Sequence, residues 1–146
     1  MSQTNRVILL IEDDPDDQFL TQNALRKSNI NNEMIVAANG EAAMAILSGC
    51  SEKDARMSCP SLILLDLNLQ GQSGLEVLRA IRANPRTCGV PVVVLTGLEE
   101  QAVVEECYRS GANSFVLKPE NGSDFAETMI QIVMYWCWLN CAPLEP

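Results

Sequence analysis

The sequence predicts an α/β fold in which a doubly wound, five-stranded parallel sheet carries helices on both faces. Strand-like apolar runs alternate with helix-like segments along the chain, which is typical of repeated βα units. The runs are continuously apolar, as expected for strands that are buried on both faces. With 146 residues, of which 47% are hydrophobic, residues 1–146 are expected to form a single domain with a substantial core.

The elements are expected in strict alternation. The strands are predicted near residues 6–11, 33–37, 61–66, 92–96 and 113–117. The helices are predicted near residues 15–28, 40–48, 74–84, 99–109 and 123–140, the last forming a C-terminal extension.

Local signals support these boundaries. Pro15 suits the first position of a helix, with Asp14 as its N-cap. Gly111 follows the fourth helix, and Pro91 leads into the fourth strand. Residues 48–61 contain glycine, serines and proline, and are expected to form a long surface loop.

Composition excludes several classes of function. A net charge of −9 and a pI near 4.4 argue against nucleic acid and anionic membranes as partners. No apolar stretch has the length of a membrane span, and no signal peptide precedes the first strand, so we expect a cytoplasmic protein. The six cysteines form no Cys-x-x-Cys pair and are expected to be free thiols.

Histidine is absent from the sequence. This excludes a Ser-His-Asp or Cys-His nucleophile, a histidine general base and a phosphohistidine on this chain. Chemistry must therefore use carboxylates, hydroxyls, lysine and a metal ion.

The ends of four predicted strands carry the groups that such chemistry needs. The first strand ends in Glu12-Asp13-Asp14, the third in Asp66, the fourth in Thr96 and the fifth in Lys118. The carboxyl edge of a parallel sheet is where ligands bind in open α/β folds. We therefore predict a site there for a divalent cation and a phosphoryl group.

The acids after the first strand need not all serve one purpose. Asp14, Asp16 and Asp17 are best explained as favourable charges at a helix N-terminus. Glu12 and Asp13 directly follow a buried strand, and like charges beside Asp66 would be costly without a cation. Oxygen ligands of this kind favour Mg²⁺ or Mn²⁺.

These motifs resemble those of the receiver domains of two-component response regulators, along essentially the whole chain. The matching segments are Ile8–Asp14, Leu64–Leu69, Val94–Gly97 and Phe115–Pro119. The resemblance implies a flavodoxin-like (βα)5 fold with strand order 2-1-3-4-5. It also implies that a sensor histidine kinase donates a phosphoryl group to Asp66.

The resemblance assigns roles to individual residues by position. Asp13 and Asp66 match direct metal ligands, Glu12 a ligand acting through water, and Asn68 a ligand through its backbone carbonyl. Lys118 matches the phosphate-binding lysine. The switch residues correspond to Thr96 and Phe115. The resemblance further suggests a cis bond between Lys118 and Pro119, and Gln70 departs from the proline that the family generally has.

The C-terminal segment narrows the resemblance to the small cyanobacterial phytochrome response regulators. Tyr135–Leu139 carries two tryptophans, and Leu144 lies between prolines. A phytochrome is therefore the implied class of kinase.

On the last helix, Phe125, Met129, Ile132, Val133 and Trp136 are expected to face the sheet. The apolar arc continues beyond that face, and we expect homodimerisation through the fourth helix, fifth strand and fifth helix. The arc is continued by Ile130, Met134, Cys137 and Cys141, with Trp138 beyond them. The predicted interface residues are Ile130, Met134 and Trp138.

Two alternatives stay open. A haloacid-dehalogenase-type phosphatase also phosphorylates an aspartate at a strand end, but it needs a second carboxylate at the position of Asn68. The chain is therefore expected to assist its own phosphorylation and dephosphorylation without being a multiple-turnover enzyme. The second alternative is a pseudo-receiver, which acts as a protein-binding scaffold without phosphorylation.

Overall fold

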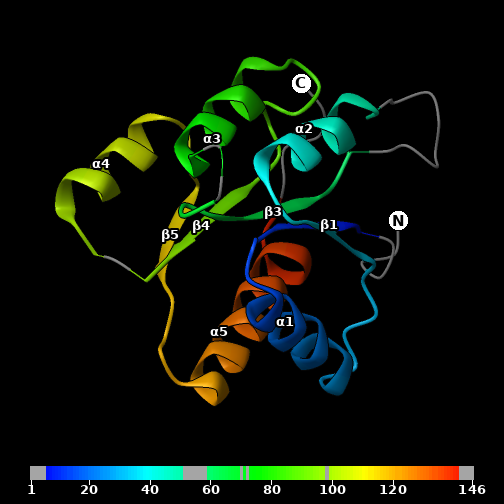
Figure 1. Cartoon of the computed structure of the whole chain (residues 1–146). Coiled ribbons are helices and arrows are strands. Elements are labelled where there is room, and N and C mark those ends of the chain that lie inside the picture. The colour runs from blue at the N-terminus through cyan, green and yellow to red at the C-terminus, as the bar shows by residue number, and fades with distance from the viewer. Residues whose placement is uncertain (1–5, 51–58, 70, 72, 98, 142–146) are drawn as a thin grey trace.

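The structure is a computed structural model that describes residues 6–50, 59–69, 71, 73–97 and 99–141. Five parallel strands form one sheet in the order β2-β1-β3-β4-β5, which confirms the predicted topology (Figure 1). The strands are β1 (Ile8–Ile11), β2 (Met34–Ala37), β3 (Leu62–Asp66), β4 (Val92–Thr96) and β5 (Ser114–Leu117).

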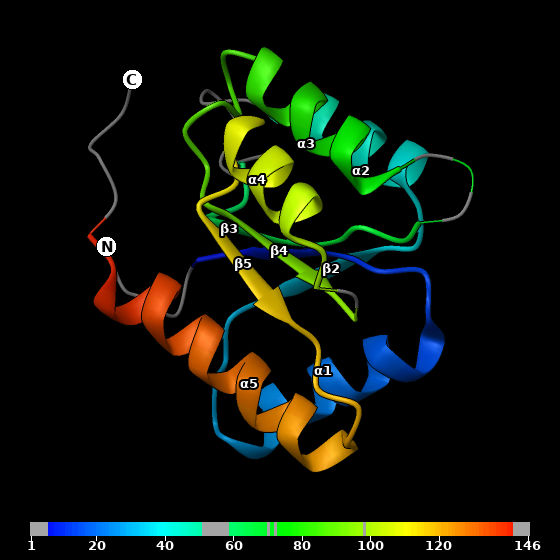
Figure 2. The ribbon, with the colours of Figure 1, turned by 90° about the vertical axis from the view of Figure 1, so that its left-hand side faces the viewer.

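Helices cover both faces of this sheet, as expected. Helices α1 (Pro15–Lys27) and α5 (Gly122–Met134) pack together on one face, and α2 (Gly40–Ser48), α3 (Gly74–Ala83) and α4 (Gln101–Arg109) lie on the other. Figure 2 shows the two helical layers with the sheet between them. Each layer has its own apolar cluster against the sheet. This is the three-layer arrangement of a doubly wound fold.

The strand register brings the functional ends to one edge. Ile11 pairs with Leu65, Asp66 with Leu95, and Thr96 with Leu117. All residues of the inner strands β1, β3 and β4 are buried, so their positions are fixed by packing on both sides. The residues that immediately follow Ile11, Leu65, Leu95 and Leu117 must therefore meet at the carboxyl edge.

The helix starts follow the local signals in the sequence. Asp14 caps α1 by accepting a hydrogen bond from the Asp16 amide, and Pro15 occupies the first helical position. Asn39 caps α2, and Ser73 caps α3. The predicted loop at 48–61 lies largely outside the described residues, which omit 51–58, and Gln70 lies outside them as well.

The last helix differs from the prediction. Helix α5 ends at Met134 and is followed by a π-helical turn, η3 (Tyr135–Leu139), in which the Asn140 amide donates to the Tyr135 carbonyl across five residues. A π-turn holds more residues than an α-turn, so each residue advances by less than about 100°. Cys137, expected on the outer arc, is consequently buried against the α1–α5 layer. Leu139 is 75% exposed.

The inner face of α5 agrees with the prediction. Its four predicted residues Phe125, Met129, Ile132 and Val133 are buried, and Trp136 packs partly buried against the same cluster. Within the described part of the chain, none of the helices has both the length and the apolar character that crossing a membrane requires.

Candidate functional site

The carboxyl edge of the sheet brings together the predicted acids. Glu12 and Asp13 follow β1, and Asp66 is the last residue of β3. One carboxylate oxygen from each of the three lies within 4.8 Å of the others. Glu12 and Asp66 are only 1% and 5% exposed, whereas Asp13 is partly exposed. The three residues form an acidic trio with two buried members and one that solvent reaches.

Lys118 extends from the end of β5 into this trio. Its Nζ atom lies 2.9 Å from Asp66 Oδ2 and 2.5 Å from Glu12 Oε1. A third carboxylate, Asp17 on α1, lies 3.0 Å from the same nitrogen. The Lys118 amide donates to the Thr96 carbonyl at 2.8 Å, which ties the base of the lysine to the end of β4. The ammonium group therefore compensates charge from three elements at once.

The electrostatics of the trio favour a cation. Burial raises the pKa of Glu12 to about 8, and a hydrogen bond and charge repulsion from Asp66 act in the same direction against the opposing effect of Lys118. Burial alone would lower the pKa of Lys118, but its hydrogen bonds to Glu12, Asp66 and Asp17 raise it above the ordinary value. One ammonium group thus leaves the buried carboxylates under-compensated. A divalent cation bound by oxygen ligands would supply the missing charge.

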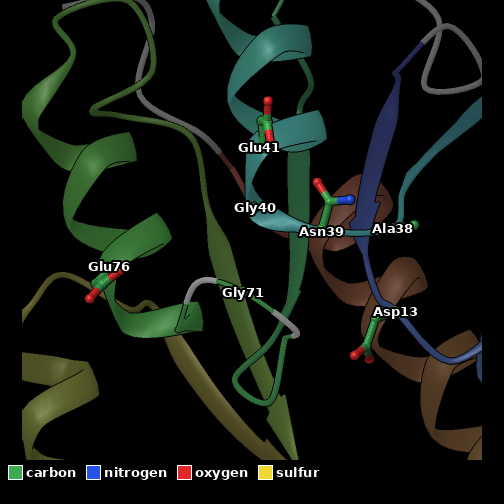
Figure 3. Close-up of a pocket in the computed structure, with 7 residues that line it drawn as sticks. All are labelled: Asp13, Ala38, Asn39, Gly40, Glu41, Gly71 and Glu76. Atoms are coloured by element: carbon green, nitrogen blue, oxygen red, sulfur yellow. The ribbon is translucent and has the colours of Figure 1, made fainter.

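The trio borders an open cavity of about 880 Å³. Figure 3 shows Asp13 among its lining residues, with Asn39 and Glu41 from the start of α2 and Glu76 from α3. Asp13 is thus the member of the trio that joins the buried carboxylates to a space that an incoming group can enter. The lining is acidic, which suits a cation with retained waters.

Backbone groups orient the Asp66 side chain. The Asn68 amide donates to Asp66 Oδ1 at 2.9 Å, while Lys118 binds Oδ2. Both carboxylate oxygens are therefore held, one on each side. The loop that follows returns at Gly74, whose amide donates to the Leu67 carbonyl at 3.0 Å.

The two predicted switch residues lie at different depths. Thr96 is 2% exposed at the end of β4, and it lines a second, largely apolar cavity of about 260 Å³ together with Asn68 and Val103. Phe115 is partly buried in β5 and packs against the α2–α4 layer. Its amide donates to the Tyr108 hydroxyl on α4 at 3.2 Å. Phe115 thus links β5 to α4.

Asp17 is the site residue that the sequence prediction assigned only to the helix terminus. It lies in the first turn of α1, whereas Asp13 precedes the N-cap residue Asp14. Its contact with Lys118 depends on how α1 packs beside β5, which the sequence pattern does not show.

The suggested cis bond before Pro119 is wrong for this structure, in which the peptide bond is trans. Trans is the more stable isomer of an X–Pro bond by about 0.5–1 kcal/mol. From this backbone Lys118 already reaches all three of its carboxylate partners.

The predicted interface residues lie on or near the outer face of α5 and η3. Met134 and Trp138 are 42% and 37% exposed, and Ile130 is partly buried against the α1–α5 layer. Tyr108 on α4 and Leu117 on β5 are also exposed apolar residues.

Comparison with known proteins agrees with this geometry. Residues 8–130 match the family described as the response regulator receiver domain. The response regulator Rcp1 of Synechocystis sp. is 38% identical over 135 residues, covering 92% of this chain and 91% of the relative. The crystal structure of the phosphorylated cyanobacterial phytochrome response regulator RcpA has a TM-score of 0.87 at 34% identity, covering 96% and 99% of the two chains.

A Mn²⁺-bound crystal structure of Rcp1 is also similar, with a TM-score of 0.83 at 38% identity over 95% of this chain and 99% of that one. The trio of Glu12, Asp13 and Asp66 is an acidic cluster of the kind that holds Mg²⁺ or Mn²⁺ in receivers. The fold, the site and the match over residues 8–130 show that this chain belongs to the response regulator receiver family and is related to Rcp1.

Proposed function

We propose that this chain is a phosphorelay response regulator in which Asp66 accepts a phosphoryl group from the phosphohistidine of a sensor histidine kinase. The observation that carries the proposal is the position of Lys118, whose ammonium group contacts Asp66 directly within the acidic trio. A nucleophilic carboxylate, a cation site and a fixed positive charge are the parts that phosphoryl transfer needs.

In the proposed reaction an Asp66 oxygen attacks the phosphorus atom in line. The oxygen–phosphorus bond forms as the nitrogen–phosphorus bond of the donor breaks, and the donor imidazole takes up a proton. Lys118 offsets charge on the phosphoryl oxygens, and the Asn68 amide holds the other Asp66 oxygen in place. Bound Mg²⁺ would neutralise further charge, with Asp13, Asp66 and the Asn68 carbonyl as direct ligands and Glu12 acting through water.

We further propose that phosphorylation is transmitted by Thr96 and Phe115. The phosphoryl group adds negative charge beside the buried Thr96 hydroxyl. A shift of Thr96 toward that charge would change the packing that holds Phe115 near α4. Because Phe115 lacks a hydroxyl group, its contribution is steric, and its backbone link to Tyr108 couples β5 to α4.

The relatives suggest the upstream partner. RcpA is a phytochrome response regulator, so a phytochrome-type histidine kinase is the proposed phosphoryl donor for this chain. The proposed output is the surface of α4, β5 and α5, where Ile130, Met134 and Trp138 form a homodimer interface or bind another protein. We propose no role in turnover of an external substrate, since Asn68 replaces the acid that a phosphatase of this type uses.

The proposal is tested by intact-mass spectrometry after incubation with acetyl phosphate, with Mg²⁺ or with a chelator. We expect one phosphoryl adduct that requires Mg²⁺ and is lost in Asp66→Asn. Asp14→Asn is the matched control, because asparagine also caps a helix and Asp14 lies outside the trio. Absence of an adduct with every divalent cation tested would overturn the proposal and favour the pseudo-receiver scaffold.

A further inference from the structure

Two cysteines lie at the ends of the connection between α2 and β3. Cys50 follows the C-terminus of α2 and is buried, and Cys59 precedes Pro60 at the entrance to β3 and is partly exposed. Both belong to the apolar cluster between the sheet and the α2–α4 layer. The two residues are nine positions apart in the sequence, yet their side chains approach each other and both residues bond to Arg86.

Arg86 bonds to both cysteines. Its Nη1 atom donates to the Cys50 carbonyl at 2.8 Å, and the Cys59 thiol donates to the Arg86 carbonyl at 3.6 Å. One residue therefore bonds to the backbone of Cys50 and to the thiol of Cys59, and so holds the two cysteines close together. The remaining cysteines lack this arrangement among the described contacts; Cys88, for example, donates its thiol to the Pro85 carbonyl.

The two thiols differ in reactivity. Burial, followed by the hydrogen bond to Cys59, raises the pKa of the Cys50 thiol to about 12. Cys59 is the more accessible of the pair, and thiolate character and exposure decide which cysteine an oxidant attacks first. Cys59 is thus placed to react first, with Cys50 as the neighbouring resolving thiol.

We propose that Cys50 and Cys59 form a reversible disulfide when a hydroperoxide oxidises the chain, which makes the α2–β3 junction a redox-sensitive modification site. The Cys59 sulfur attacks the hydroperoxide, the oxygen–oxygen bond breaks, and a sulfenic acid and an alcohol or water are formed. The Cys50 sulfur then attacks the Cys59 sulfur, and the hydroxide that leaves takes the Cys50 proton as water. The two thiols lose two electrons and the hydroperoxide gains them.

The proposed disulfide can be tested separately from phosphorylation, because the cysteine pair shares no residue with the acidic trio. Disulfides in reducing compartments are usually transient or regulatory rather than structural. A pair that is free and in contact in the reduced chain is consistent with such a role.

The test is a tryptic map of the full chain after treatment with hydrogen peroxide and alkylation of the remaining thiols. Trypsin cleaves after Lys53 and Arg56, so a Cys50–Cys59 bond would join peptides 28–53 and 57–79. We expect this linked pair in oxidised wild type, at the intact mass of one chain less two hydrogen atoms. Dithiothreitol should abolish it.

Cys59→Ser should eliminate the link, and Cys88→Ser, which removes an exposed cysteine near Arg86, should leave it unchanged. Either of two results in wild type would overturn the proposal. One is Cys59 advancing to sulfinic acid while Cys50 still accepts alkylating reagent. The other is a link that joins Cys50 or Cys59 to a different peptide.

Discussion

At the scale of single residues, Lys118 organises the site. Its ammonium group is shared by Glu12, Asp17 and Asp66, which come from the β1–α1 loop, α1 and β3. In the proposed reaction, Lys118 would compensate the charge of the phosphoryl group that arrives at Asp66. Glu12 and Asp17 are then the groups that hold the lysine, and Asp17 lies outside the acidic trio. Asp17 is therefore a positioning residue that can be changed without removing a metal ligand.

Asp17→Asn should slow phosphorylation of Asp66 by acetyl phosphate about tenfold, because small displacements of a reacting group have large kinetic effects. The free energy of unfolding should change by less than about 1 kcal/mol, since Lys118 keeps two other carboxylate partners. Rates would be measured by intact mass at saturating Mg²⁺. Asp16→Asn, at the neighbouring exposed position, is the control and should keep the wild-type rate. Equal rates for both variants would contradict the role of Asp17.

The site residues could be predicted to different extents. Asp66, Thr96 and Lys118 stand at the ends of apolar runs, so parallel strands alone bring them to one edge. The contact of Asp17 with Lys118 depends instead on the packing of α1, for which the local sequence holds no signal. Metal binding by the trio and the role of Phe115 stay predictions.

At the scale of elements, Gly74 controls how closely α3 approaches β3. A Cβ atom at this position would lie 2.5 Å from the Asp66 carbonyl oxygen and 2.6 Å from Leu67 Cα. Both are backbone atoms, so a larger residue forces the loop that carries Asn68 to move. Glycine is required at position 74 because the start of α3 lies very close to the backbone of Asp66 and Leu67, beside the candidate phosphorylation site.

Gly74→Ala should lower the free energy of unfolding by about 1–3 kcal/mol, the usual range for overpacking. Phosphorylation of Asp66 should also slow, because the loop that holds its carboxylate shifts. Urea denaturation measures the first effect and acetyl phosphate kinetics the second. Gly89→Ala is the matched control, since nothing lies within 4 Å of a Cβ atom there. A Gly74→Ala variant as stable as Gly89→Ala would refute the steric account.

A second contact between elements joins α3 to α4. Glu106 on α4 accepts hydrogen bonds from Arg79 on α3 at 2.6 Å and from Arg109 at 2.5 Å. The hydrogen bond from Arg79, together with Arg109, holds the pKa of Glu106 below its usual value. A carboxylate whose pKa is lower in the folded chain adds stability above its unfolded pKa, and that stability is lost as the pH falls through the folded pKa.

Glu106→Gln should therefore reduce stability slightly at pH 7, with a difference from wild type that shrinks as the pH falls below the ordinary glutamate value of about 4.3. The effect is small because the residues are exposed to solvent and salt. Urea denaturation over a series of pH values measures it. Glu105→Gln is the control and should track wild type throughout. A difference that grows toward acid pH would contradict a lowered pKa for Glu106 in the folded chain.

The end of α5 could be predicted from the sequence only in part. Periodicity identifies its buried face, because Phe125, Met129 and Val133 follow α-helical spacing. The change to a π-turn at Tyr135 depends on backbone hydrogen bonding that spacing does not encode. For this reason the prediction for Cys137 was wrong. The strands, in contrast, could be predicted within about two residues, since continuous apolar runs require burial on both faces.

At the scale of the whole molecule, exposed apolar side chains lie on α4, β5, α5 and η3. They comprise Tyr108, Leu117, Met134, Tyr135, Trp138 and Leu139. Phe19 on α1 is exposed as well, at 61%. Four of these residues fall within positions 134–139, and several exposed apolar side chains in one short segment support the proposed homodimer more strongly than a single one does.

The double variant Met134→Glu, Trp138→Glu should weaken self-association by at least about tenfold, because charges are introduced into an apolar contact. Sedimentation velocity over a range of concentrations measures this, with and without phosphorylation. Phe19→Glu is the matched control, since it changes an exposed aromatic residue on α1, outside the proposed interface. Unchanged sedimentation of the double variant would rule out this face as the dimer interface.

Phosphorylation of Asp66 at the carboxyl edge of the sheet can be tested directly. Borohydride reduces an acyl phosphate to an alcohol and so converts a phosphorylated aspartate to homoserine, which peptide sequencing by mass spectrometry locates. Asp66 is the one aspartate in tryptic peptide 57–79. After acetyl phosphate and Mg²⁺, we predict homoserine at position 66 and none when Mg²⁺ is chelated. Homoserine at Asp13 or Asp17 instead, or at no position, would contradict phosphorylation at Asp66.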